Sequence, residues 1–374
     1  MNNWQGLYGH PQIKNFLDKL NGSDSTPQAL LFFGKSGVGK DFFAFRFAEN
    51  SINISLNKIG EPTLPFESMV DKGLIRMIYA LPRGKNEDSD DDPLIKLTTK
   101  ELENIKEEQK RKISNPYYDL QIAGANQIKI NSIRDVIRVL SLNRDYRQKN
   151  FVIILDADLM RVEAQNSLLK MLEEPPPNTT FILTTSRLEF IAETIRSRSW
   201  MVNFGILFDE EISKILEEYF DIEPERFRDL LPLANGSVSH MMNILSGSES
   251  DIRELVIEFL RNTMAAKFNS GYKLLEEFTE GESSRLILLI DLVSIWFRDL
   301  TRFRIGNDDL YYKEFVSAFE KFDSRYKHIG TGNIHKKLEY YRNILSNTNV
   351  NQSVVSFNLI FALADLIYNF NQKK

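Results

Sequence analysis

Two stretches of the sequence carry residue types that handle phosphate groups in other proteins. The first runs from Gly34 to Lys40 and reads GKSGVGK, between a short apolar run and a helical pattern. Glycines at this spacing let backbone N–H groups close around phosphates at a helix N-terminus, and the final lysine adds a positive charge. The candidate phosphate-binding residues are therefore Gly34, Gly37, Gly39 and Lys40.

The residue after this loop argues against phosphoryl transfer. A phosphate loop of this type carries Ser or Thr there to bind Mg²⁺, whereas this chain carries Asp41. Its carboxylate would lie beside nucleotide phosphates and repel them unless a metal ion intervened. Three interpretations stay open: a working nucleotide site, a loop that binds nucleotide without turnover, and a structural remnant. We favour the remnant and expect no nucleotide cofactor.

The second stretch is an apolar strand followed by a helix with a distinctive sequence. Residues 152–160 read VIILDADLM, and residues 166–177 read NSLLKMLEEPPP. This helix resembles the signature of the clamp-loader subunits of bacterial DNA polymerase III, which are AAA+ proteins. The resemblance extends to residues 127–130 upstream and to residues 181–185 and 194–199 downstream.

The resemblance implies that the catalytic groups of an active family member are missing. Such a member carries a Mg²⁺-binding Asp and a catalytic Glu where this chain has Leu155 and Asp156. A leucine cannot bind magnesium, and an aspartate is shorter than the glutamate that orients water. Active members also carry, in a small helical lid domain, an arginine that contacts the terminal phosphate of the nucleotide. In this chain Ser239 stands at that position. A metal site formed by Asp156 and Asp158 is the alternative that the residues leave open.

One catalytic element of the family is retained, and it would act on a neighbouring subunit. The family's Ser-Arg-Cys motif supplies an arginine finger to ATP bound by the adjacent subunit, and here the motif reads Ser197-Arg198-Ser199. The resemblance therefore implies that Arg198 is an arginine finger acting in trans. Arg196 is a nearby competitor. The alternative is that Arg198 is a surface arginine paired with a local carboxylate.

The order of apolar segments predicts the architecture that positions these residues. Short buried runs at 29–33, 151–155 and 180–184 alternate with helical patterns, which indicates an α/β fold with a doubly wound parallel sheet. Past Phe204 only helical patterns remain. By resemblance we expect an AAA+ domain at 1–205, a small helical lid at 206–248 and an all-α collar at 249–374.

Residues 52–116 look inserted into the AAA+ domain. Members of the family's delta-prime branch carry a four-cysteine zinc module in this interval, but the chain contains no cysteine, so we expect no zinc. Within the interval, the carboxylate run 86–92 is typical of a solvated loop. Residues 98–112 have the pattern of a mixed-charge helix.

Composition limits the class of protein further. A net charge of −5 over 374 residues argues against a surface that wraps nucleic acid, so any DNA contact should be local or shared with partners. The apolar run 286–297 is interrupted by Asp291, and residues 1–10 lack the pattern of a secretion signal. We therefore expect no membrane contact and a cytoplasmic location.

Together these features predict a delta-prime-like subunit that does not hydrolyse ATP itself. The resemblance implies a clamp loader that places a sliding clamp on primer-template DNA, with a gamma/tau-like ATPase and a delta-like clamp opener as partner subunits. The alternative is an active AAA+ ATPase, such as the gamma/tau-like motor subunit of the same loader.

Overall fold

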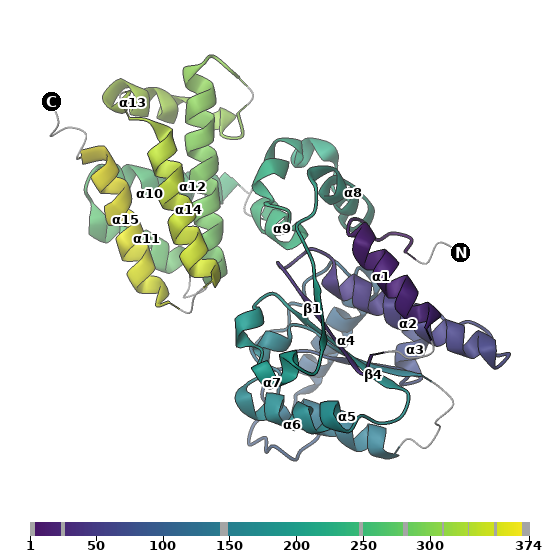
Figure 1. Ribbon diagram of the computed structural model, residues 1–374. Coiled ribbons are helices and arrows are strands. Elements are labelled where there is room, and N and C mark those ends of the chain that lie inside the picture. The colour runs from purple at the N-terminus through teal and green to yellow at the C-terminus, as the bar shows by residue number, and fades with distance from the viewer. Residues whose placement is uncertain are drawn as a thin grey trace. The chain divides into compact units, whose positions relative to one another are not determined.

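The computed structural model describes residues 4–23, 27–142, 149–246, 250–279, 283–308, 310–327, 329–347 and 350–368. The chain divides into two compact units, Met1–His240 and Met241–Lys374. Figure 1 shows that the first unit combines a sheet with helices and that the second consists of helices. The phosphate loop and the other candidate site residues all lie in the first unit.

The first unit is built on a parallel five-stranded sheet with the order β2-β3-β4-β1-β5. Every residue of β3 and of β4 is buried, as expected of central strands covered on both faces. Because the strands are parallel, the loops that follow β1 and β3 open at the same edge of the sheet. The strands are β1 Ala29–Phe33, β2 Ile75–Ile78, β3 Asn150–Ile154, β4 Thr179–Thr185 and β5 Trp200–Asn203.

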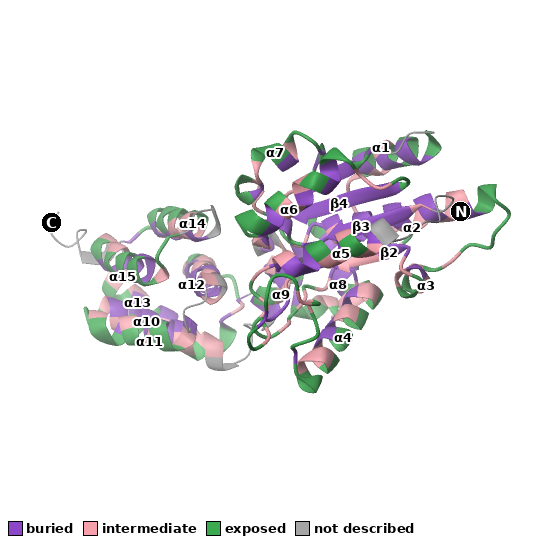
Figure 2. Cartoon of the chain, turned by 90° about the horizontal axis from the view of Figure 1, so that it is seen from below, coloured by how far each residue is buried: buried purple, intermediate pink, exposed green. Residues whose placement is uncertain are grey.

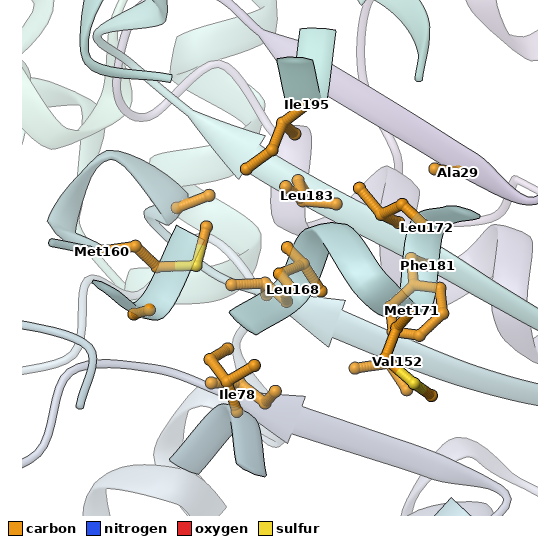
Figure 3. Packing of buried hydrophobic residues seen from close by; sticks show 14 of the residues in the cluster. Ala29, Ile78, Val152, Met160, Leu168, Met171, Leu172, Phe181, Leu183 and Ile195 are labelled. Atoms are coloured by element: carbon orange, nitrogen blue, oxygen red, sulfur yellow. The ribbon is translucent and has the colours of Figure 1, made fainter. Parts of the chain in front are cut away.

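Helices α5 and α6 cover one face of this sheet. Leu168, Met171 and Leu172 of α6 recur at helical spacing, so they form one apolar stripe. Figure 3 shows this stripe lying against Val152 of β3 and Phe181 of β4, in one buried cluster. Burying each such side chain stabilises the fold by about 1.5–3 kcal/mol.

Helices α1 and α2 pack together, and α2 also packs against β3 and β4. Phe43 and Phe47 of α2 are fully buried, and the ring of Phe47 meets that of Phe151 edge to face, with 5.9 Å between centroids. Figure 2 shows buried residues concentrated along the strands and along the helix faces turned toward them. This packing fixes the start of α2, which carries the last residue of the phosphate loop.

The first unit contains eight α-helices and the start of a ninth within the described residues. Helix α4 begins with a capping box, in which Thr98 and Glu101 each bind the backbone N–H of the other. The helices are α1 Pro11–Gly22, α2 Lys40–Lys58, α3 Phe66–Asp71, α4 Thr99–Ser114, α5 Ile130–Leu142, α6 Val162–Glu173, α7 Glu193–Arg196 and α8 Asp209–Phe220, with α9 Val238–Ser246 reaching past the unit boundary.

The second unit packs its helices around α12. The ring of Trp296 contacts Phe319 and Phe322, each with 5.2 Å between centroids, and all three are buried. No helix in the described ranges is both long and apolar enough to cross a lipid bilayer. The helices are α10 Ser250–Met264, α11 Phe268–Thr279, α12 Ser283–Arg304, α13 Val316–Tyr326, α14 Thr331–Asn347 and α15 Gln352–Tyr368.

The predicted α/β fold with a parallel sheet and a helical C-terminal part is confirmed. Residues 127–130, which belong to the family resemblance, form no strand; an isolated bridge joins Ile128 to Met160. Within the interval 52–116, α2 continues to Lys58 and β2 forms the edge strand of the main sheet. The boundaries given for the lid and the collar stay predictions.

Candidate functional site

The phosphate loop has the local geometry that its glycines predict. It connects the end of β1 to Lys40, the first residue of α2, and Gly37 and Gly39 adopt left-handed φ angles of 69° and 95°. Residues with a Cβ rarely adopt such angles, so glycine is required at both turns. The backbone could therefore close around a ligand, provided that the space inside the loop is free.

The loop lysine is instead bound to the loop itself. The ammonium group of Lys40 donates hydrogen bonds to the backbone oxygens of Gly34 and Lys35, at 2.8 and 2.5 Å. Lys40 is buried, and this burial lowers the pKa of its ammonium group. The charge that would face a phosphate thus already has acceptors within the loop.

A segment from the start of α9 lies against the other side of the loop. Val238 donates its N–H to the carbonyl of Gly37 at 3.1 Å, and the hydroxyl of Ser237 donates to the carbonyl of Ser36 at 2.8 Å. A Cβ added to Gly37 would lie 2.2 Å from the backbone nitrogen of Ser239. The loop and this segment are therefore in close contact.

Asp41 forms a buried ion pair with a lysine from α4. The ammonium group of Lys112 lies 2.7 Å from an Asp41 carboxylate oxygen and also donates to the carbonyls of Pro116 and Tyr118. Burial alone would raise the pKa of Asp41, but the positive charge of Lys112 outweighs it and holds this pKa below 3.8. Burial lowers the pKa of Lys112, yet the carboxylates of Asp41 and Asp119 raise it above 10.5.

The space left beside the loop is a cavity of about 20 Å³, lined by residues that include Gly37, Lys40, Asp41, Lys112 and Asp156. That volume holds about one water molecule, which needs roughly 10–15 Å³, and so it is too small for a triphosphate. The position expected for Mg²⁺ holds the Asp41–Lys112 ion pair instead. The residues present therefore do not fit magnesium and nucleotide.

The mouth of this cavity is acidic. Asp119 and Asp156 line the cavity. Each residue as a whole is exposed to solvent, but its carboxyl group is surrounded by protein atoms. This crowding, together with the carboxylates of Asp41, Asp119 and Asp158, raises the pKa of Asp156 to about 7. An approaching phosphate would meet carboxyl groups rather than positive charge, which opposes binding.

The residues at the end of β3 do not form the alternative metal site. Leu155 is buried, and Asp156 has a left-handed φ of 49°. Asp158 is directed elsewhere, since its carboxylate accepts hydrogen bonds from Thr185 at 2.6 Å and from Arg187 at 2.8 Å. In the described part of the chain, no group of three or more His, Asp or Glu residues could hold a metal ion.

Arg198 lies just beyond α7 on the surface of the first unit. Its guanidinium donates to the carbonyl of Thr194 at 3.0 Å and lies 3.0 Å from a carboxylate oxygen of Glu173, at the end of α6. The side chain is 37% exposed, whereas Arg196 is half-buried. Arg198 is therefore the more accessible of the two, and it has the local carboxylate partner that the alternative interpretation requires.

Reasoning from the sequence missed Lys112, the residue that neutralises Asp41. The only available signal was its spacing, since Ile105, Glu108 and Lys112 share the buried face of α4. That pattern shows that position 112 faces inward but not which residue it meets. The ion pair could be found only once α4 was placed beside the phosphate loop.

Three similarities to known proteins agree with the motifs. A family model described as DNA polymerase III, delta subunit, matches residues 85–207. Subunit delta prime of DNA polymerase III from Bacillus subtilis is 28% identical over 208 residues, which are 54% of this chain and 62% of that protein. Subunit gamma of DNA polymerase III from Buchnera aphidicola is 29% identical over 131 residues, 34% of this chain and 36% of that protein.

The chain thus matches between about a third and three fifths of the length of these relatives. A solved gamma-subunit-related protein of DNA polymerase III from Thermotoga maritima aligns over 95% of this chain and 99% of its own, with 14% identity and a TM-score of 0.41. So low a score adds nothing to what the sheet topology shows. The motifs, the family model and the two subunits together support a bacterial clamp-loader protein of the AAA+ family as the kind of protein that this chain resembles.

Proposed function

We propose that this chain is a non-hydrolysing, delta-prime-like subunit of a DNA polymerase III clamp loader. In this role it acts as a stator: it helps to hold the ring of loader subunits together while a sliding clamp is placed on primer-template DNA. Its partners would be a gamma/tau-like ATPase and a delta-like clamp opener. The observation that carries the proposal is the ion pair between Asp41 and Lys112 at the position of the metal ion.

Three independent features of the site support the absence of hydrolysis. Lys40 is bonded to its own loop, the remaining cavity holds about one water molecule, and Leu155 provides no ligand for magnesium. Phosphoryl transfer depends on positioning and on charge stabilisation by a metal ion and cations. A site that lacks the space and the metal ligand supplies neither.

The isolated chain provides the first test. We expect no hydrolysis of radiolabelled magnesium-ATP and no binding of a fluorescent ADP analogue at concentrations up to about 1 mM, the upper end of typical KM values. Hydrolysis that is abolished by Lys40→Ala would show instead that the chain is a motor subunit. Binding without hydrolysis would favour a loop that retains nucleotide as a structural ligand.

We further propose that Arg198 serves as an arginine finger for ATP bound by a neighbouring subunit. Its guanidinium lies at the surface and uses only part of its five N–H donors on Thr194 and Glu173, so others remain for a phosphate. An arginine supplied in trans accelerates transfer by about 10³- to 10⁵-fold at the site that it serves.

A loader reconstituted from this chain and its partner subunits tests the finger. We expect Arg198→Ala to lower the clamp- and DNA-stimulated ATPase rate sharply while the ring still assembles in gel filtration. Arg196→Ala is the matched control and should leave the rate near that of the wild type. An unchanged rate for Arg198→Ala would refute the finger and leave the surface ion pair as its role.

A further inference from the structure

Strand β2 is an edge of the sheet, and its outer backbone groups are free. Phe151 and Leu155 donate to the carbonyls of Leu74 and Ile78, both at 2.8 Å, so alternate residues of β2 face β3. Ile75, Met77 and Tyr79 alternate with the residues that face β3, so their N–H and C=O groups point outward. No hydrogen bond joins these outward groups to another segment in the described part of the chain.

A cavity of about 260 Å³ runs along this free edge, and we call it the β2 groove. Its floor is formed by residues 75–79. One wall is formed by Gln109 of α4 together with Pro93 and Leu94, which precede that helix. The other wall is formed by residues of α5 that include Asp135. Leu94 of this wall is an apolar side chain that is 38% exposed, and the next residue along the chain, Ile95, is 70% exposed. Exposed apolar side chains beside an open strand edge mark an interaction site rather than a protected edge.

The β2 groove also contains an unpaired positive charge. Arg76 lines it, and its guanidinium lies against Gly73 without a hydrogen bond or ion pair to any described residue. The acidic residue of the groove is not available to Arg76, because Asp135 is paired with Arg138. A partner that brings a carboxylate to this position would therefore complete the charge balance.

We propose that the β2 groove binds an extended, acidic peptide segment of a partner protein. The segment adds a strand to β2 through the outward groups of Ile75, Met77 and Tyr79 and places a carboxylate against Arg76. A helix satisfies its own backbone hydrogen bonds and would leave this edge unpaired, whereas an extended peptide satisfies both sides. A second copy of this chain would bring a second Arg76 into the groove, and like charges on adjacent strands are unfavourable.

This surface goes beyond the proposed role in clamp loading, since it uses neither the phosphate loop nor Arg198. Three fluorescein-labelled hexapeptides test it by fluorescence anisotropy with the full chain: alternating Val-Glu, alternating Val-Lys, and Val-Glu with a methylated backbone. We expect only the first to bind. The lysine peptide lacks the carboxylate, and the methylated peptide lacks the N–H donors that a new strand needs.

Matched variants locate the binding. Arg76→Glu should weaken the Val-Glu peptide at least tenfold, whereas Arg83→Glu, an exposed arginine outside the β2 groove, should leave its affinity within twofold. Hydrogen exchange gives a second measurement that needs no variant: the peptide should slow exchange of the Met77 and Tyr79 amides. Both amides are among the outward groups that an added strand would cover.

Several outcomes would overturn the proposal. One is the absence of binding by the Val-Glu peptide, and another is equal binding by the Val-Lys peptide or by the Arg76→Glu variant. Protection only of amides outside residues 75–79 would place the peptide elsewhere. A concentration-dependent dimer that slows exchange at Met77 would show that a second copy fills the edge. None of these outcomes affects the ATPase test of Arg198.

Discussion

The ammonium group of Lys112 on α4 lies 2.7 Å from the carboxylate of Asp41 on α2, inside the site where a related ATPase would hold magnesium. The side chains are 3% and 19% exposed, so neither charge can rely on water for its solvation. A buried charge that loses its partner is strongly unfavourable, and so the two residues depend on each other. This mutual dependence gives the first two predictions.

Lys112→Met should destabilise the protein by about 3–5 kcal/mol, because it leaves the Asp41 carboxylate buried without its cation. Urea unfolding measures this. Adding Asp41→Asn to Lys112→Met should recover a large part of the loss, since no unpaired charge remains. Lys96→Met removes the more exposed ion pair with Asp91 and should change stability little. If Lys112→Met unfolds at the same urea concentration as the wild type, the pair does not stabilise the site.

The same ion pair sets a pH window for stability. The pKa of Asp41 is held below 3.8, so its contribution is present above that pH and is lost as the pH falls through the lowered value. The pKa of Lys112 is raised above 10.5, so its contribution is present below that pH and is lost as the pH rises through the raised value. The wild type should therefore keep a constant difference from Asp41→Asn/Lys112→Met between about pH 5 and about pH 9.

Below about pH 4 this difference should shrink, because protonation of Asp41 ends the attraction. Urea titrations at a series of pH values measure the two proteins side by side. The double variant has neither titrating group, so it serves as the reference for the wild type. A difference that grows toward acidic pH would contradict the direction assigned to the pKa of Asp41.

Gly37→Ala tests the contact between the phosphate loop and the segment at the start of α9. Gly37 and Gly60 have similar left-handed φ angles, 69° and 76°, so alanine strains the backbone equally at both positions. A Cβ at Gly37 would meet Ser239 at 2.2 Å, whereas nothing lies within 4 Å of one at Gly60. Gly60→Ala should cost about 1 kcal/mol and Gly37→Ala at least about twice that in thermal or urea unfolding. Equal costs would mean that the segment moves away freely.

Glu173 tests how the guanidinium of Arg198 is held. The ion pair is exposed, so Glu173→Gln should change the free energy of unfolding by only about 0.5 kcal/mol or less. If the carboxylate positions Arg198, the variant should lower the ATP turnover of the assembled loader while leaving its KM nearly unchanged. Glu193→Gln, an exposed acidic residue of α7, is the control. A faster loader would show that Glu173 restrains Arg198 rather than positions it.

Much of the first unit follows from local pattern. The run 29–33 is apolar throughout and is followed by glycines, so it predicts a buried strand that leads into a loop, and β1 has these bounds. The helix expected to carry the signature that begins at Asn166 is α6, Val162–Glu173. Strand β2 was missed because Arg76 interrupts its apolar run, and an edge strand needs less burial than a central one.

By itself the sequence determined the parallel α/β fold, and it predicted the glycine-rich loop at 34–40, since both depend on neighbours along the chain. Only the tertiary structure decided what fills the site and which edge stays open. Asp41 and Lys112 are brought together by the packing of α4 against the loop, and the β2 groove exists only between that helix and α5. Such contacts depend on how elements that are distant in the sequence pack together. Local periodicity predicts that a side chain is buried but not which residue it contacts.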